Sequence, residues 1–319
     1  MRSYIIRRLL LLIPTLFFVT VIIFLLVRFV PGTAVDVIEA SLSRGGTTNI
    51  DREAIAHALG LDVPIHIQYK NWITGILFHG DLGTSIIQSR PVLEMITERM
   101  PVTLELGIFS LLIMIIISLP LGIYSAIRQG TLADFIGRTI AILFMAIPIF
   151  WTATLIMIYP SIWWGWSPPV ELITFSEDPL GNLAMFILPA AIVGMMIAGM
   201  GMRLTRTTML DVMRQDYIRT AWAKGLDEKV VILRHAIKNA FIPVVTMIGG
   251  AIGMLLSGQV IIEQIFCLPG IGQLLLQGLN QRDYPLISGI TLILSLFVMF
   301  SNLIVDISYS WLDPRVRYK

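Results

Sequence analysis

The apolar positions of this chain are gathered into six long stretches, each separated from the next by a polar segment. A helix needs roughly 20 consecutive apolar residues to cross the hydrocarbon of a bilayer, and all six stretches have about that length. The predicted spans are Leu9–Val30, Val102–Ile127, Phe135–Trp163, Leu183–Met202, Phe241–Ile262 and Leu286–Trp311. The pattern therefore predicts an all-α polytopic membrane protein with six transmembrane helices.

Composition supports this class. Hydrophobic residues make up 56% of the chain and charged residues 14%, against roughly 45–50% and 25% in ordinary globular domains. The first apolar stretch, Leu9–Val30, is longer than the roughly 7–15 residues of a secretory signal, and no small-residue cleavage site follows it. We therefore expect the first stretch to stay in the protein as a helix.

Basic residues give the expected orientation, because cytoplasmic loops of membrane proteins are enriched in Lys and Arg. The N-terminus, the segment Arg203–Lys238 and the C-terminal tail hold most of the 23 basic residues, whereas the short loop Trp164–Asn182 has none. This distribution predicts that both the N- and C-termini are cytoplasmic.

A long outer segment, Pro31–Pro101, contains two predicted helices. One is opened by Asp51 and ends before Gly60, and the other covers Pro64–Phe78. We interpret the segment as a small folded cap, which either packs on the spans alone or also receives a partner or gates the outer mouth. The predicted organisation is a first helix at 1–30, this outer loop at 31–101, a transmembrane core at 102–311 with a cytoplasmic loop at 203–240, and a tail at 312–319.

The cytoplasmic segment that begins at Asp216 has the pattern helix, glycine, helix. Ala221, Ala223 and the pair Ile218 and Trp222 would give the first helix an apolar face. Lys224 lies in its last turn, and Gly225 lies where a left-handed residue often ends a helix. Asp227 can cap a second helix, in which the apolar residues recur at helical spacing, at Val230, Leu233, Ile237 and Phe241.

Small residues recur every four positions in two predicted spans, a spacing that lets helix backbones approach closely in a membrane. The residues are Ala190, Gly194 and Ala198 in the fourth span and Gly249, Gly253 and Ser257 in the fifth. They predict either packing within the chain, or a subunit interface or a solute pathway kept wide by small side chains.

Sites for catalysis, for metal or for nucleic acid are not predicted. The four histidines show no ligand spacing, and no phosphate-binding glycine loop is present. An ion-coupled carrier would be expected to place acids near the bilayer midplane, whereas Glu105 and Asp306 lie near the ends of their spans. This position argues against secondary transport.

Several motifs together resemble a known family. Arg219-Thr220-Ala221 with Gly225, followed by His235-Ala236-Ile237-Lys238-Asn239, resembles the cytoplasmic loop of binding-protein-dependent ABC importer permeases. Arg219 stands where the general pattern has Glu, and Ile237-Lys238 where it has Leu-Pro; both departures are similar to the B-type permeases of dipeptide, oligopeptide and nickel importers. Further matching pieces are Tyr4-x-x-Arg7-Arg8, Leu59-Gly60-Leu61-Asp62, Gly80-Asp81-Leu82-Gly83, Arg282-Asp283-Tyr284-Pro285 and Asp313-Pro314-Arg315.

The resemblance implies a type I ABC importer permease, not an enzyme, in a bacterial or archaeal cytoplasmic membrane. Its implied partners are a second, C-type permease, two ATPase subunits that bind ATP and magnesium, and an extracytoplasmic binding protein. Peptides are the implied solute, with nickel complexes, glutathione and oligosaccharides as alternatives. The resemblance assigns coupling to the ATPases to Asp216, Tyr217, Arg219, Thr220, Ala221, Ala223, Lys224 and Gly225.

Overall fold

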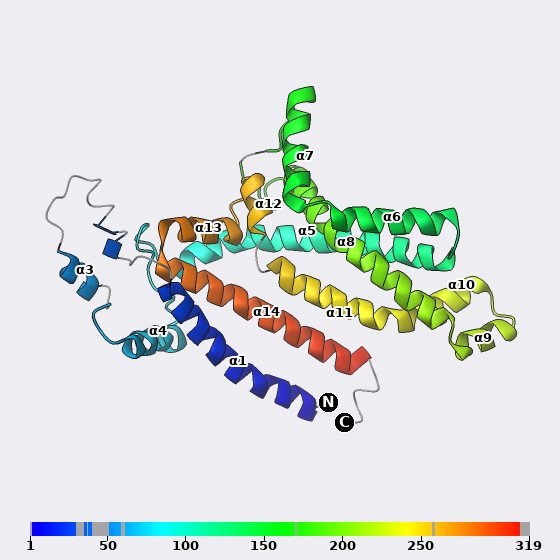
Figure 1. The fold of residues 1–319 in the computed structure, drawn as a ribbon, viewed down its shortest axis with the longest axis horizontal. Helices are drawn as coiled ribbons and strands as arrows, with labels where there is room; N and C mark the ends of the chain where they lie inside the picture. The colour runs from blue at the N-terminus through cyan, green and yellow to red at the C-terminus, as the bar shows by residue number, and fades with distance from the viewer. Residues whose placement is uncertain are drawn as a thin grey trace. The chain divides into compact units, whose positions relative to one another are not determined.

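The computed structural model describes residues 2–29, 35–36, 38–39, 51–58, 61–169, 171–256 and 259–312. These residues form helices and connecting turns, with one isolated β-bridge between Thr84 and Pro91 and no strand within the described ranges (Figure 1). The chain divides into two compact units. The first unit contains Leu104–Leu268 and Phe300–Lys319, and the second contains Arg2–Thr103 and Pro269–Met299.

Six helical segments correspond to the six predicted spans. Five of them are single helices long and apolar enough to cross a membrane, and the sixth is a bent pair of helices. The five are α1 (Arg2–Phe29), α5 (Val92–Ile127), α8 (Pro179–Met213), α11 (Ile237–Leu256) and α14 (Tyr284–Leu312). The all-α membrane fold is thus confirmed by the length and composition of its helices.

The predicted third span, Phe135–Trp163, is not one continuous helix. It consists of α6 (Leu132–Ala146) and α7 (Ile149–Trp164), which meet at an angle of 90°. The break falls at Ile147-Pro148, where Ile147 has an extended backbone. A proline disfavours the helical conformation in the residue before it and has no N–H to continue the hydrogen-bond ladder, so a straight span was the wrong prediction here.

The predicted fifth span, Phe241–Ile262, is also interrupted. Helix α11 ends at Leu256, and a separate short helix, α12, covers Val260–Ile265. At its other end α11 follows directly on a π-helical segment, Val231–Ala236. Apolar composition alone extended the predicted span across a change of chain direction.

In the second unit, helix α4 (Ile65–His79) packs on α1. The Phe24 ring lies 5.4 Å from the Tyr69 ring and 5.8 Å from the Trp72 ring, measured between centroids. Both predicted helices of the outer segment are present. The other is α3 (Arg52–Ala58). At its start a carboxylate oxygen of Asp51 accepts a hydrogen bond from the Glu53 amide, at 3.1 Å. The outer segment therefore contains folded helices as predicted.

Two sequence motifs about 200 residues apart meet in the second unit. The Ser85 hydroxyl, next to Gly80–Gly83, donates to the buried carboxylate of Asp283 at 2.5 Å. The other Asp283 oxygen accepts the Leu286 amide at the start of α14, at 3.3 Å. Helix α13 (Ile271–Gln281) ends beside this contact and adds Ile271 and Leu274 to the apolar core of the unit. Asp283 thus joins the outer segment to the start of α14.

The first unit is organised around α8, which packs on α6 and α11. Close approach requires small residues: a Cβ at Gly194 would lie 2.7 Å from the Ser110 carbonyl oxygen of α5, and one at Gly199 would lie 2.6 Å from the Ala141 carbonyl oxygen of α6. Ala190 and Ala198 are fully buried. Within the described residues, this row of small side chains therefore packs inside the unit. Helix α8 ends at Met213, two residues before α9 (Asp216–Ala223).

Candidate functional site

The candidate site is α9 with the turn and short helix that follow it. Helix α9 begins at Asp216 as predicted and ends at Ala223, so that Lys224, predicted to lie in its last turn, is the residue that follows it. Its inner side is buried, with Ile218 at 0% and Ala221 at 7% exposure. Trp222 and Ala223, which were predicted to share this apolar face, are exposed instead. The helix is thus held by two inward residues and turns its remaining side chains outward.

The end of α9 is a defined turn. Gly225 has a left-handed φ of +78°, its amide donates to the Trp222 carbonyl at 2.9 Å, and the Leu226 amide donates to the Ala221 carbonyl at 3.4 Å. This pair of bonds is the Schellman arrangement, which satisfies the last carbonyls of a helix and favours glycine at the left-handed position. The predicted stop at Gly225 is confirmed.

Beneath α9 lies an apolar cluster drawn from five helical elements of the first unit, α9 included. The cluster joins the cytoplasmic-loop residues to the end of α5 and the end of α8. Its buried members are Ala126, Met209, Ile218, Ala221, Val231, Ile232, Ala236 and Ala240. Movement of α9 would therefore be transmitted through direct packing to α5, α8 and α11.

The apolar face predicted for the helix after Gly225 was wrong at its first two positions, Val230 and Leu233, whereas Ile237 packs against the apolar cluster. Val230 is 39% exposed and Leu233 is 68% exposed, whereas Val231, Ile232 and Ala236 are buried. The α-helix there covers only Glu228–Val230 (α10), and the π-helical segment that follows has a wider turn, which shifts the buried residues relative to an α-helical pattern. Asp227 precedes α10 as expected, but its side chain caps no amide.

One hydrogen bond ties α9 to the start of α11. The Asn239 side-chain amide donates to the Tyr217 hydroxyl at 2.8 Å. Tyr217 lies two residues before the first half of the recognised motif, which begins at Arg219, and Asn239 belongs to the second half. The bond fixes the two halves to each other across the turn at Gly225.

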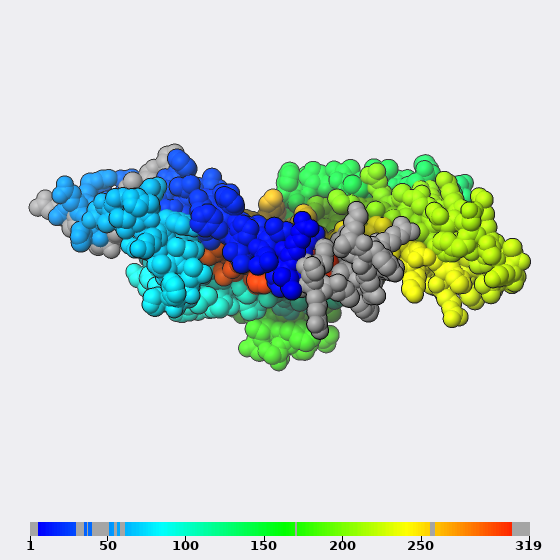
Figure 2. All heavy atoms as spheres, turned by 90° about the horizontal axis from the view of Figure 1, so that it is seen from below, coloured from blue at the N-terminus to red at the C-terminus, as the bar shows by residue number. Residues whose placement is uncertain are grey.

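The outer face of α9 is open to solvent (Figure 2). Its only ion pair in the described structure joins Arg219 to Asp216 at 3.7 Å, with side chains 70% and 97% exposed. Thr220, Ala223 and Lys224 are also exposed. Of the eight predicted coupling residues, seven therefore lie on this open face or at its end, and only Ala221 is packed inward.

The small residues predicted in α11 pack within the first unit. A Cβ at Gly249 would lie 1.8 Å from a Val305 methyl of α14, and the Gly249 carbonyl accepts the Ser301 hydroxyl at 3.2 Å. Gly253 is buried. Ser257 lies outside the described residues. The geometry at Gly249 favours packing within the chain over an open pathway at that position.

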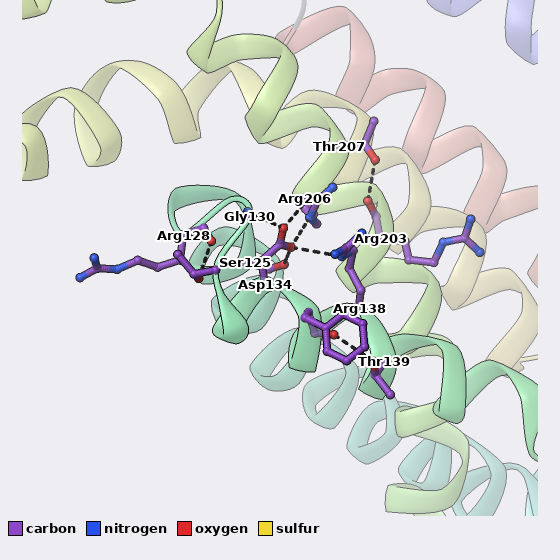
Figure 3. Close-up of polar contacts among 11 residues, drawn as sticks. Ser125, Arg128, Gly130, Asp134, Arg138, Thr139, Arg203, Arg206 and Thr207 are labelled. Atoms are coloured by element: carbon purple, nitrogen blue, oxygen red, sulfur yellow. Dashed lines mark hydrogen bonds and ion pairs between the residues drawn. The ribbon is translucent and has the colours of Figure 1, made fainter.

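A polar contact that the sequence did not reveal joins α6 to α8. The Asp134 carboxylate, 1% exposed, accepts two hydrogen bonds from the Arg206 guanidinium at 2.7 and 2.8 Å (Figure 3). It also accepts the Ser125 hydroxyl at 2.6 Å and the Gly130 amide at 3.0 Å. Asp134 lies one residue before the predicted third span, and Arg206 was counted only as a cytoplasmic charge.

Metal-binding geometry is not found in the described part of the chain, where no three His, Cys, Asp or Glu side chains gather as a possible ligand set. The polar groups near α9 are hydrogen-bonded to helices or turned to solvent. The candidate site is therefore an exposed surface, formed by a short helix on a packed base.

Comparison with known proteins gives the family. Residues 1–107 match the N-terminal part, and residues 118–318 the main part, of the family described as the binding-protein-dependent transport system inner membrane component. A protein named for a peptide transport system permease in Brucella abortus is 39% identical over 318 residues, covering 100% of both chains. The glutathione transport system permease protein of Salmonella choleraesuis is 38% identical over 319 residues, again covering 100% of both. The chain therefore belongs to the family of permease subunits of binding-protein-dependent ABC importers, as a membrane component and not an enzyme.

Proposed function

We propose that this permease subunit carries peptides across a bacterial or archaeal cytoplasmic membrane, and that α9 is the helix through which separate ATPase subunits drive it. The single observation that carries the coupling role is the division of α9 into two faces. Ile218 and Ala221 anchor it to the chain's own helices, while Arg219, Ala223 and Lys224 face outward. Such a helix can be gripped from outside and still move its own spans.

The proposed machine has further parts. A second, C-type permease pairs with this one, two ATPase subunits close on ATP and magnesium, and an external binding protein delivers the solute. Both termini and α9 face the cytoplasm, in agreement with the distribution of Lys and Arg. Switching between inward-open and outward-open states requires two packings of similar free energy, whose balance nucleotide and binding protein shift.

Peptide is the proposed solute because of the names of similar proteins. The Brucella relative is named for peptide transport and the Salmonella relative for glutathione, which is itself a short peptide. A ligand panel on the binding protein that copurifies with the complex tests this directly. Selective binding of di- or oligopeptides would support the proposal, and selective binding of a nickel complex or an oligosaccharide would overturn the choice of solute.

The coupling role is tested by Ala223→Glu. Ala223 is exposed, so the new carboxylate leaves the apolar cluster intact but occupies space where an ATPase would fit. We expect normal insertion and normal thermal stability, with uptake reduced about tenfold or more, the size of effect seen when a central interface contact is lost. A new carboxylate at an exposed turn outside α9 and outside the spans, Gln129→Glu, should leave uptake unaltered.

Ala221→Glu is a less suitable test, because Ala221 is only 7% exposed. A carboxylate there would enter the apolar cluster and disturb the base of α9 as well as any docking surface. Normal uptake and normal solute-stimulated ATP hydrolysis in Ala223→Glu would remove the proposed coupling role.

A further inference from the structure

A groove between α6 and α8 is lined by three arginines and by no acidic residue. The groove is small, and Arg138, Arg203 and Arg206 line it together with Ser125 and Gly137. The groove lies at the end of α8 that leads into α9, beyond the apolar part of the helix. Basic side chains gathered at this level between two membrane helices are an unusual concentration of one sign of charge.

The nearby carboxylate neutralises only part of that charge. Asp134 is bound in a bidentate manner by Arg206 and lies 3.6 Å from the Nε of Arg138. Arg203 has no carboxylate partner among the described residues; its recorded side-chain contact is with the Met145 sulfur, at 3.9 Å. In Figure 3 the Arg138 and Arg206 side chains point at Asp134 and Arg203 extends away from it. Three guanidinium groups and one carboxylate leave a surplus of two positive charges.

The arginines retain the donors that an anion requires. A guanidinium has five N–H groups in a planar fork, and Arg206 uses two of its nitrogens on Asp134. Arg138 is half-exposed and Arg203 is exposed, so their donors reach solvent. Guanidinium groups of this kind match the oxygen geometry of phosphate.

The surface next to the arginines is apolar. Phe135 and Ile142 lie three residues before and four residues after Arg138, on the same side of α6, and are 60% and 58% exposed. Met200, one turn before Arg203 on α8, is 55% exposed. A free anion would make no favourable contact with these apolar side chains, whereas the acyl chains of a lipid would pack against them.

We infer that the exposed guanidinium groups of Arg138 and Arg203, beside this groove, bind the phosphate headgroup of an anionic phospholipid, with the acyl chains lying along the apolar side of α6. Basic pockets between membrane helices on the cytoplasmic side bind such headgroups. The bound lipid would brace the α6–α8 contact just before α8 leads into α9. The inference uses only contacts within the first unit and does not depend on the identity of the transported solute.

Native mass spectrometry of the full-length chain, purified in mild detergent with whatever subunits accompany it, tests the inference. Phosphatidylglycerol and phosphatidylcholine are titrated separately, and bound lipid is counted. We expect phosphatidylglycerol to bind more tightly. Arg138→Gln and Arg203→Gln should each weaken its binding about fivefold, the effect of removing one basic side chain near an anionic lipid.

Arg128→Gln is the matched control, because Arg128 is exposed, lies outside the groove and points away from Asp134 (Figure 3). It should leave lipid binding unchanged. Equal loss in Arg128→Gln and Arg203→Gln, or equal binding of the two lipids, would overturn the inference. So would displacement of the lipid by an equal concentration of glycerol phosphate, which would indicate a site for a soluble phosphate. None of these measurements requires ATP hydrolysis or uptake, so a failed coupling test would leave the result standing.

Discussion

Two polar regions of the first unit handle charge in opposite ways. At the α6–α8 contact, Asp134 is 1% exposed and accepts hydrogen bonds from Arg206, Ser125 and Gly130. On α9, Asp216 and Arg219 are 3.7 Å apart and largely exposed. The first region has its charge satisfied inside the chain, and the second leaves its charge available to another molecule. The difference separates a part that holds the fold from the part that we propose as the docking site of the ATPases.

The largest effect is expected at the buried charge. Asp134→Ala removes the partner of Arg206, whose side chain is only 19% exposed, and breaking a buried pair from one side costs about 3–5 kcal/mol. We expect a lower thermal unfolding temperature and less folded protein in the membrane. The double variant Asp134→Leu with Arg206→Met should recover much of the loss, because two apolar side chains leave no unpaired charge.

Asp216→Ala is the comparison on α9. An exposed ion pair contributes only about 0–1 kcal/mol, so its thermal unfolding should match that of the unaltered protein. Equal unfolding temperatures for Asp134→Ala and Asp216→Ala would show that the contrast between the two regions is wrong.

Two neighbouring glycines of α11 show a similar contrast, because one is tightly packed inside the chain and the other is not. Gly249→Val places a side chain where a Val305 methyl already lies, and overpacking of this kind costs about 1–3 kcal/mol. Gly250 has no atom within 4 Å of an added Cβ, and alanine is favoured over glycine in a helix by about 0.5–1 kcal/mol. Thermal unfolding should therefore fall in Gly249→Val and stay level or rise in Gly250→Ala; the reverse order would contradict the packing described.

A smaller effect is expected at the end of α9. Gly225→Ala meets no steric obstacle, but an L-residue in the left-handed conformation costs roughly 1–2 kcal/mol. The last turn of α9 should loosen, which hydrogen exchange of the Leu226 amide would detect. Gly225→Asn should retain more protection, because asparagine tolerates this conformation better. If alanine and asparagine give the same exchange rate as glycine, the turn does not depend on its φ.

The smallest effect is expected for Arg219→Ala. Its pair with Asp216 is exposed at both ends, so the stability change should stay below about 1 kcal/mol. Any loss of uptake beyond that of Asp216→Ala would then reflect a contact outside this chain. Comparing uptake and unfolding temperature in the same preparation separates the two.

Features that depend on nearby residues were predictable from the sequence. The length of α9, its end at Gly225, and helices α3 and α4 follow from local capping and spacing signals. The six apolar stretches were found from their length, although the 90° bend at Ile147-Pro148 was missed because apolar content does not register direction.

Features that depend on distant residues were not predictable. Asp134 and Arg206 are 72 positions apart, and Ser85 and Asp283 are 198 apart, so neither pair leaves a periodic pattern. The π-helical segment Val231–Ala236 shifted the buried face in a way that an α-helical period could not indicate. Of the four residues assigned to the apolar face of α9, Ile218 and Ala221 are buried in the apolar cluster, whereas Trp222 and Ala223 are exposed, and only the packing of the helix decides between them.

The most direct test of the account is cross-linking from α9. The native Cys267 is replaced by serine, and a single cysteine is introduced at Ala223, which is exposed, or at Ala221, which is buried. In membranes that contain the whole importer, a thiol-reactive cross-linker should join the cysteine at 223 to an ATPase subunit, and the cysteine at 221 should give little product. Absence of any ATPase adduct at 223, in a complex that still transports, would contradict the claim that α9 is the helix the ATPases hold.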